Sequence, residues 1–148
     1  MAVITCDVLV EGVQRDILME WLAQPDVQDT VVRAGFDKVE RSGTNWKIHL
    51  AVSPKPRDVG YEFDCVDDSH GGRRVKFNLT GKRTTGVLHY SLRTMKPARN
   101  TLVTLHADYD PGGVLGQVID GMGLNKGLEN GFRGVLEAVK IEAEKLES

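Results

Sequence analysis

The strongest constraint on the fold is a change of hydrophobic period along the chain. Between residues 33 and 109 apolar and polar side chains alternate, which is typical of β-strands with one face in a core. Between residues 112 and 146 apolar side chains recur every three to four positions, as they do on one side of an α-helix. The sequence therefore predicts a run of strands followed by a long amphipathic helix.

Seven strands are expected in all. Six of them lie in the alternating region and are bounded by turn-forming residues, at 36–41, 45–52, 60–66, 74–79, 87–94 and 101–109. Because the connections between these six are short and contain no helix, the strands must be antiparallel neighbours in a meander. The stretch 3–10 is rich in Val and Ile and predicts one strand more.

Helical patterns flank this meander. Two short helices are predicted before it, at 14–22 and 25–32. The C-terminal segment contains a row of glycines, Gly116, Gly123, Gly127, Gly131 and Gly134. Each glycine costs about 0.5–1 kcal/mol relative to alanine inside a helix. We therefore expect a broken or 3₁₀ stretch at 120–127 between a short helix and a long final one; the alternative is a stripe that allows close packing or leaves room for a ligand.

These elements predict one α+β domain over residues 1–148. A seven-stranded curved antiparallel sheet has one apolar face that must be covered, and the long C-terminal helix is the large amphipathic element that can cover it. A pleated sheet is wider than a single helix of about 10–12 Å diameter. We therefore expect a deep apolar cavity between the concave face and this helix, with the two short helices closing one end. Such hollows are where small molecules bind.

Composition and charge exclude several functional classes. The chain is 41% hydrophobic and carries a formal net charge of −2, so we expect neither disorder nor nucleic-acid binding. No apolar stretch approaches the roughly 20 residues of a transmembrane helix, and the N-terminus does not resemble a secretory signal. Cys6 and Cys65 stand alone, without the spacing of a metal site. These features predict a cytoplasmic protein without disulfide, structural zinc or cofactor.

The order of elements resembles the START-like (SRPBCC, helix-grip) superfamily over nearly the whole chain. The segment 109–116, YDPGGVLG, is similar to the strand-to-helix junction of the polyketide cyclase/dehydrase branch, and 134–140, GVLEAVK, is similar to the final helix of that branch. One departure is the start of the first helix, where 13–18 lacks the proline of a typical member. The resemblance implies a helix-grip fold and a hydrophobic ligand such as a lipid or polyketide.

Candidate ligand-binding residues follow from the inward side of each strand and helix. They are Trp46, Ile48, Leu50, Tyr61, Phe63, Phe77, Leu88, Tyr90, Leu105, Tyr109, Leu115, Ile119, Met122 and Phe132. The three tyrosines are also weak catalytic candidates, since a phenol in an apolar cavity can orient a carbonyl or donate a proton. The alternative is that all three are core residues whose hydroxyls find internal partners.

The histidines argue against a hydrolytic or metal centre. His49, His89 and His106 fall on outward positions, and His70 lies in a hairpin loop. Cys65 is expected to point inward but has no activating base. His89 and His106 are expected to be cross-strand neighbours on the outer face, where we predict no functional metal.

Residues 73–99 include eight Lys or Arg and no Asp or Glu. This segment is expected to form a solvated outer face, with Glu62 and Asp64 pairing with Arg74 and Lys76. The leading prediction is therefore binding of an apolar or aromatic small molecule. A cyclase or dehydratase, and an interaction module that uses the basic face, are the alternatives.

Overall fold

The computed structural model describes residues 2–51, 56–67, 73–82, 84–97, 99–111 and 118–147, with side chains from 123 to 146 in the last range. The elements in order are β1 (Ala2–Val10), α1 (Arg15–Leu22), α2 (Pro25–Gly35), β2 (Lys38–Ser42), β3 (Asn45–Leu50), β4 (Arg57–Asp67), β5 (Arg74–Thr80), β6 (Thr85–Met95), β7 (Asn100–Asp110), α3 (Val118–Glu144) and the 3₁₀ turn η2 (Lys145–Glu147).

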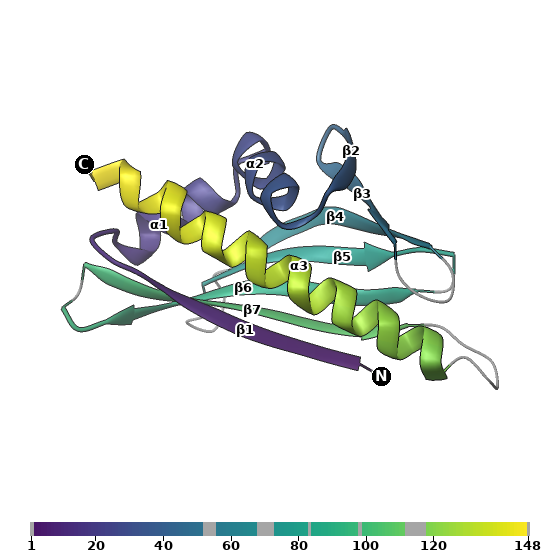
Figure 1. The fold of residues 1–148 in the computed structure, drawn as a ribbon. Helices are drawn as coiled ribbons and strands as arrows, with labels where there is room; N and C mark the ends of the chain where they lie inside the picture. The colour runs from purple at the N-terminus through teal and green to yellow at the C-terminus, as the bar shows by residue number, and fades with distance from the viewer. Residues whose placement is uncertain are drawn as a thin grey trace.

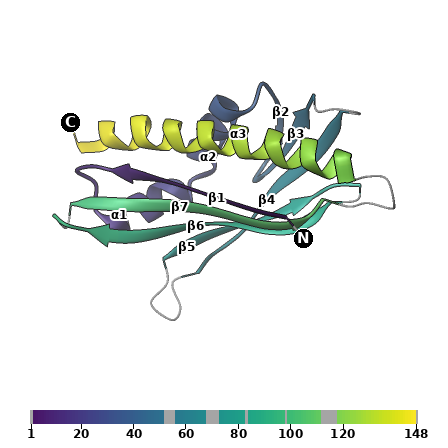
Figure 2. The same ribbon diagram turned by 60° about the horizontal axis from the view of Figure 1, so that its bottom comes forward.

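The strands form one antiparallel sheet in the order β1-β7-β6-β5-β4-β3-β2. The first strand therefore closes the meander by pairing with the last one, from Ala2 opposite Tyr109 to Val10 opposite Thr101. Helix α3 runs diagonally across one face of this curved sheet (Figure 1). Helices α1 and α2 lie near the C-terminal half of α3. Figure 2 shows α3 as a separate layer above the strands. The predicted α+β architecture is confirmed.

The expected break in the C-terminal helix is wrong, because α3 is one continuous α-helix. Close packing explains two of its glycines, Gly131 and Gly134. A Cβ at Gly131 would collide with the ring of Phe36, and a Cβ at Gly134 would lie 3.0 Å from the Cα of Gly35. Close approach of α3 to the end of α2 therefore offsets the helix cost of these two glycines, as the close-packing alternative anticipated.

The core lies between the concave face of the sheet and the helices. Its strand residues are the inward positions that the alternation predicts, for example Ile48, Val75 and Leu105, all fully buried. The helix contributes Leu124, Leu128, Phe132, Val135, Leu136, Val139 and Ala143. The spacing of these residues by three and four keeps one side of α3 against the sheet.

Strand β4 departs from the predicted alternation at Cys65. The register with β5 shifts between Phe63 and Cys65, so that Cys65 lies opposite Lys76 and Val66 lies opposite Val75. Because this bulge inserts one extra residue, Cys65 lies on the outer row and the inward prediction for it is wrong. Both cysteines are free. No helix in the described ranges is long and apolar enough to cross a bilayer.

Candidate functional site

Two of the predicted tyrosines meet in the centre of the core. The hydroxyls of Tyr61 on β4 and Tyr90 on β6 are 2.8 Å apart, and the Tyr61 hydroxyl donates to Gln28 Oε1 on α2 at 2.7 Å. Since each phenol carries one proton, Tyr90 then donates to the Tyr61 oxygen. Gln28 Nε2 in turn donates to the carbonyl oxygen of Leu22 at the end of α1. This network ties both short helices to the sheet.

The network is buried, and burial controls its protonation. Tyr61, Tyr90 and Gln28 are each no more than 1% exposed. Burial raises the pKa of Tyr61 well above its usual value, and the neighbouring Tyr90 raises it further. Burial likewise raises the pKa of Tyr90. Both phenols are therefore neutral hydrogen-bonding groups, and neither is a base near neutral pH.

Aromatic rings fill the space around this network. Tyr61 stacks on Phe77 with ring centroids 4.2 Å apart, and Phe77 meets Tyr90 edge-on at 5.9 Å. Trp46 meets Tyr61 at 5.8 Å. Because all four side chains are no more than 2% exposed, the hollow expected here is occupied by side chains. The part of the interior beside α2 is a packed core.

The third tyrosine belongs to a second polar group at the other end of the concave face. The Tyr109 hydroxyl on β7 donates to Asn125 Oδ1 on α3 at 2.8 Å. Opposite Tyr109 in the sheet stands Gly86, where a Cβ would collide with the tyrosine. Burial raises the pKa of Tyr109 to about 12, although the nearby positive charge of Arg57 acts to lower it. This pair joins the sheet to the long helix.

Arg57 brings a charge to the same end of the sheet. It is the first residue of β4 and lies opposite the buried Leu50, on the inward side of its strand. Its Nη2 donates to Thr84 Oγ1 at 3.0 Å and to the carbonyl oxygen of Pro111 at 2.8 Å. The polar end of the concave face therefore combines a phenol, an amide and a guanidinium.

No protein-family model matches the chain, and no curated protein matches it in sequence. Solved structures do match it. The ZhuI aromatase/cyclase from Streptomyces sp. R1128 superposes with a TM-score of 0.67 and 18% identity over 97% of this chain and 94% of that one. A START superfamily protein from Mycobacterium smegmatis superposes with a TM-score of 0.63 and 10% identity, over 97% of this chain and 98% of that one. The XoxI protein from Bacillus cereus superposes with a TM-score of 0.65 and 13% identity, over 100% of this chain and 99% of that one.

The chain has a START-like, helix-grip fold. Eleven of the fourteen predicted ligand-binding residues of this START-like fold have described side chains, and they lie on the strands and on α3. Those that are buried are Trp46, Ile48, Leu50, Tyr61, Phe77, Leu88, Tyr90, Leu105, Tyr109 and Phe132, whereas Phe63 is half-buried. Leu115 lies outside the described residues, as do the side chains of Ile119 and Met122. Whether these positions contact a ligand stays a prediction.

Gln28, Arg57 and Asn125 are site residues that the sequence analysis missed. Gln28 has a recognisable signal, because it shares one face of α2 with the buried Val31 and Val32. Arg57 lies before the predicted start of its strand at residue 60, so the alternation of that strand does not assign its side chain to either face. Asn125 falls in the stretch where a break in the helix is expected. With a break there, the helical period does not predict that Asn125 lies next to the buried Leu124 and one turn before the buried Leu128.

Trp46 has a polar role in addition to its place in the core. Its Nε1 donates to Asp29 Oδ1 on α2 at 3.0 Å, and Arg33 Nε donates to the same oxygen at 2.9 Å. Burial alone would raise the pKa of Asp29, but the hydrogen bonds from Trp46 and Arg33 lower it overall. Asp29 is therefore ionised and fastens α2 to β3.

The outer face of the START-like sheet holds the histidine pair that the sequence predicts. His89 lies opposite His106 with ring centroids 5.3 Å apart, and His106 Nδ1 is 3.0 Å from Thr5 Oγ1. Burial lowers the pKa of His89, and the charge of Arg74 lowers it further. Among the described residues, no group of three or more His, Cys, Asp or Glu could hold a metal ion.

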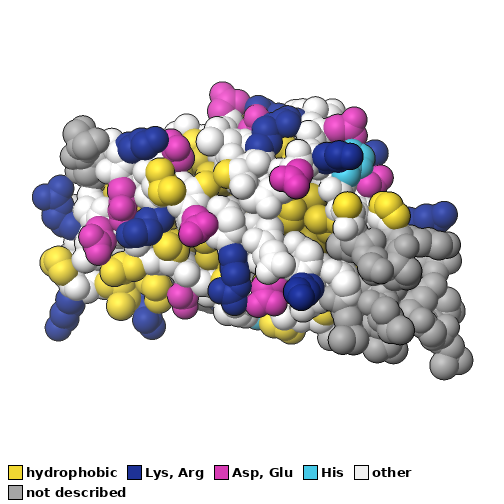
Figure 3. Space-filling view, viewed as in Figure 1, with side chains coloured by type: hydrophobic (Ala, Val, Ile, Leu, Met, Phe, Trp, Pro, Cys, Tyr) yellow, Lys and Arg dark blue, Asp and Glu magenta, His cyan; other side chains and the backbone are white. Residues whose placement is uncertain are grey.

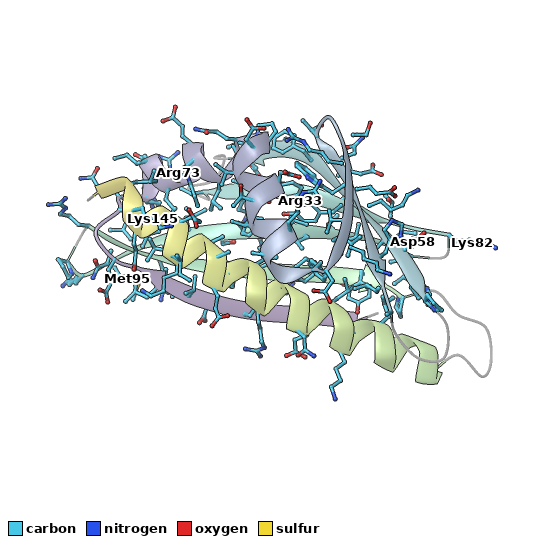
Figure 4. The ribbon with its side chains drawn as sticks, turned by 45° about the horizontal axis from the view of Figure 1, so that its top comes forward. Arg33, Asp58, Arg73, Lys82, Met95 and Lys145 are labelled. Atoms are coloured by element: carbon cyan, nitrogen blue, oxygen red, sulfur yellow. The ribbon has the colours of Figure 1, made fainter. Side chains whose placement is uncertain are left out.

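The basic segment 73–99 does not form one continuous patch. Lys76 pairs with Asp67 at 3.3 Å instead of Glu62 or Asp64, because the bulge in β4 moves Asp67 opposite Arg74. Arg73 pairs with Asp16 of α1 at 3.4 Å. Arg73 and Lys82 lie at opposite ends of the molecule (Figure 4). Charge neutralisation and this separation weaken the interaction-module alternative.

A groove of about 380 Å³ lies outside the sheet–helix interior, between the short helices and the end of α3. Its lining includes the apolar side chains of Trp21, Val27, Val31 and Leu146. Acidic and basic side chains surround small apolar areas on this face of the molecule (Figure 3). None of the predicted ligand-binding residues lines this groove.

Proposed function

We propose that the protein binds an apolar or aromatic small molecule, such as a lipid or a polyketide, between the sheet and α3. The observation that carries this proposal is a phenol, an amide and a guanidinium gathered at one end of a largely apolar concave face. Small-molecule sites typically combine an apolar wall with a few convergent polar groups. The START-like fold of the ZhuI aromatase/cyclase and of the other matching structures supports this proposal.

The hydrogen bonds at the two ends of the interior support one end as the position of this site. The end beside α2 is filled by Trp46, Tyr61, Phe77 and Tyr90, which are satisfied by one another and by Gln28. A ligand there would have to displace a closed hydrogen-bond network, at the cost of unpaired buried polar groups. We therefore propose the ligand at the opposite end, where the one hydrogen bond between Tyr109 and Asn125 leaves the amide nitrogen and the phenol oxygen able to bind it. We also propose the reducing cytoplasm as the location, because both cysteines are free.

Titration with an environment-sensitive dye tests the binding proposal. The dye 1-anilinonaphthalene-8-sulfonate should bind saturably with enhanced fluorescence, and apolar aromatic compounds should compete it off. Ala107→Trp, which adds bulk to the concave face two residues from Tyr109, should weaken binding, whereas Val87→Trp on the exposed outer face should leave it unchanged. Absence of saturable binding, or equal loss in both variants, contradicts the proposal.

A second candidate is a cyclase or dehydratase, favoured by the likeness to an aromatase/cyclase structure. In this mechanism the Tyr109 hydroxyl would turn from Asn125 Oδ1 to a substrate carbonyl and polarise it by hydrogen bonding, while the apolar walls hold a flexible substrate in a reactive conformation. A phenol with a pKa of about 12 donates a hydrogen bond but holds its proton firmly. Tyr109→Phe should then abolish turnover of a poly-β-ketone substrate while binding persists. Unchanged turnover excludes this role for Tyr109.

A further inference from the structure

We infer that Tyr109 and Asn125 together recognise a hydroxyl group of the ligand. This inference rests on the proposed function and specifies the ligand chemistry at that site. The two side chains come from opposite layers of the fold, β7 and α3, and their polar atoms meet at 2.8 Å. A molecule held between sheet and helix at this end meets the hydrogen-bond donors and acceptors that the pair leaves unused.

The inventory of donors and acceptors defines what remains unused. The phenol donates its one proton to Asn125 Oδ1, so the Tyr109 oxygen keeps lone pairs that can accept. The Nδ2 of Asn125 keeps N–H groups that can donate. If the amide is rotated by 180°, Nδ2 donates to the phenol oxygen, and the pair then offers the phenol proton and Oδ1 instead. In either orientation the pair offers at least one donor and at least one acceptor side by side.

A hydroxyl group is complementary to such a pair, because it donates one hydrogen bond and accepts another. A ketone or an ether accepts only, so it would leave the acceptor of the pair without a partner. Asn125 is half-buried and its neighbours Leu124 and Leu128 are fully buried, so a ligand that covers the amide would exclude water from the pair. An acceptor left without a partner there would then lose a hydrogen bond. The pair therefore favours an alcohol or a phenol over a ketone or an ether of similar size.

A carboxylate is the other possible polar group, because Arg57 lies at the same end of the sheet. However, Arg57 Nη2 already donates to Thr84 Oγ1 and to the Pro111 carbonyl oxygen, and this fixes its direction. A carboxylate, like a ketone, cannot donate to the acceptor of the Tyr109–Asn125 pair. The geometry thus favours a hydroxyl group, and the experiment includes a carboxylic acid as the competing possibility.

Three naphthalene derivatives of similar size separate these possibilities, namely 2-naphthol, 2-methoxynaphthalene and 2-naphthoic acid. Competition against a bound dye should show 2-naphthol binding about tenfold or more tightly than the other two, as expected when a buried polar partner is left unpaired. Equal affinity for naphthol and its methyl ether, with saturable binding of both, overturns the inference and leaves the proposed function standing. Tightest binding of naphthoic acid overturns it in favour of Arg57. Binding of none of the three contradicts the proposed function itself.

Variants assign the preference to the pair. Tyr109→Phe and Asn125→Ala should each reduce the preference for naphthol over its methyl ether to about twofold or less. Asn130→Ala is the matched control, because Asn130 is an exposed asparagine of the same helix, and the preference should be unchanged in it. Thermal unfolding of each variant verifies that the fold is retained. A full preference in Asn125→Ala overturns the assignment to Asn125.

Discussion

Gln28 Oε1 on α2 accepts a 2.7 Å hydrogen bond from the Tyr61 hydroxyl on β4, and both groups are buried. The same amide donates to the Leu22 carbonyl oxygen, which lies at the end of α1. One side chain thus connects both short helices to the centre of the sheet. In a low-dielectric interior such a bond is strong when made and costly when broken.

Replacing Gln28 by leucine should destabilise the protein by about 1–3 kcal/mol, because a buried phenol proton and the Leu22 carbonyl oxygen lose their partners. Chemical denaturation measures the loss. Gln24→Leu is the control, since Gln24 at the start of α2 is exposed and makes no capping hydrogen bond, and it should change the stability by less than about 0.5 kcal/mol.

The coupling within the network can be measured separately. Once Gln28 is leucine, Tyr61→Phe should cost less than it does in the wild-type protein, because its hydroxyl no longer has an acceptor on α2. Additive losses in the double variant would mean that Gln28 and Tyr61 stabilise the fold independently.

Gly131→Ala should destabilise the protein by about 1–3 kcal/mol, even though alanine is the better helix former. The added Cβ collides with the ring of Phe36, which lies between α3 and the end of α2. Unfolding experiments on Gly131→Ala, Phe36→Leu and the double variant test this. The smaller side chain at position 36 should reduce the cost of the alanine. A stabilising Gly131→Ala would show that α2 and α3 can separate without loss.

His49 and His89 should titrate on opposite sides of the usual histidine pKa of about 6.5. Hydrogen bonds to Glu40 and then Asp58 raise the pKa of His49, whereas burial and then Arg74 lower that of His89. Protonated His49 therefore stabilises the fold; this contribution is fully present below the unfolded pKa and is lost as the pH rises through the folded-state pKa. Histidine NMR titrations measure both values. Glu40→Gln should lower the pKa of His49 alone, and a reversed order in the wild type contradicts the geometry.

The sheet was predictable because its signal is local. Alternation with a period of two decides which side of a strand is buried, and Ile48, Val75 and Leu105 follow it. The bulge at Cys65 was not predictable in this way, since a single extra residue reverses the alternation without changing the composition. The continuous helix was missed for a related reason, because the space that makes Gly131 acceptable belongs to Phe36, almost a hundred residues earlier in the sequence.

The polar part of the candidate site was the least predictable. Gln28 and Tyr61 are 33 positions apart in sequence, and Arg57 and Pro111 are 54 apart. Such contacts depend on how the helices lie on the sheet, which hydrophobic periodicity does not specify. The inward tyrosines could be predicted from strand parity, whereas their partners could not.

All three tyrosines of the chain should resist ionisation in the folded protein. Each is buried with a raised pKa, that of Tyr109 to about 12. In the unfolded chain tyrosines ionise near pH 10. Absorbance at 295 nm should therefore show little tyrosinate in the native protein at pH 10.5 and most of three in guanidinium chloride. Because the folded state holds these protons more tightly, stability is fully present below about pH 10 and falls as the pH rises through the folded-state values. Tyr109→Phe should remove the first native titration step, and a native tyrosine that ionises near pH 10 would show that one of the three phenols reaches water.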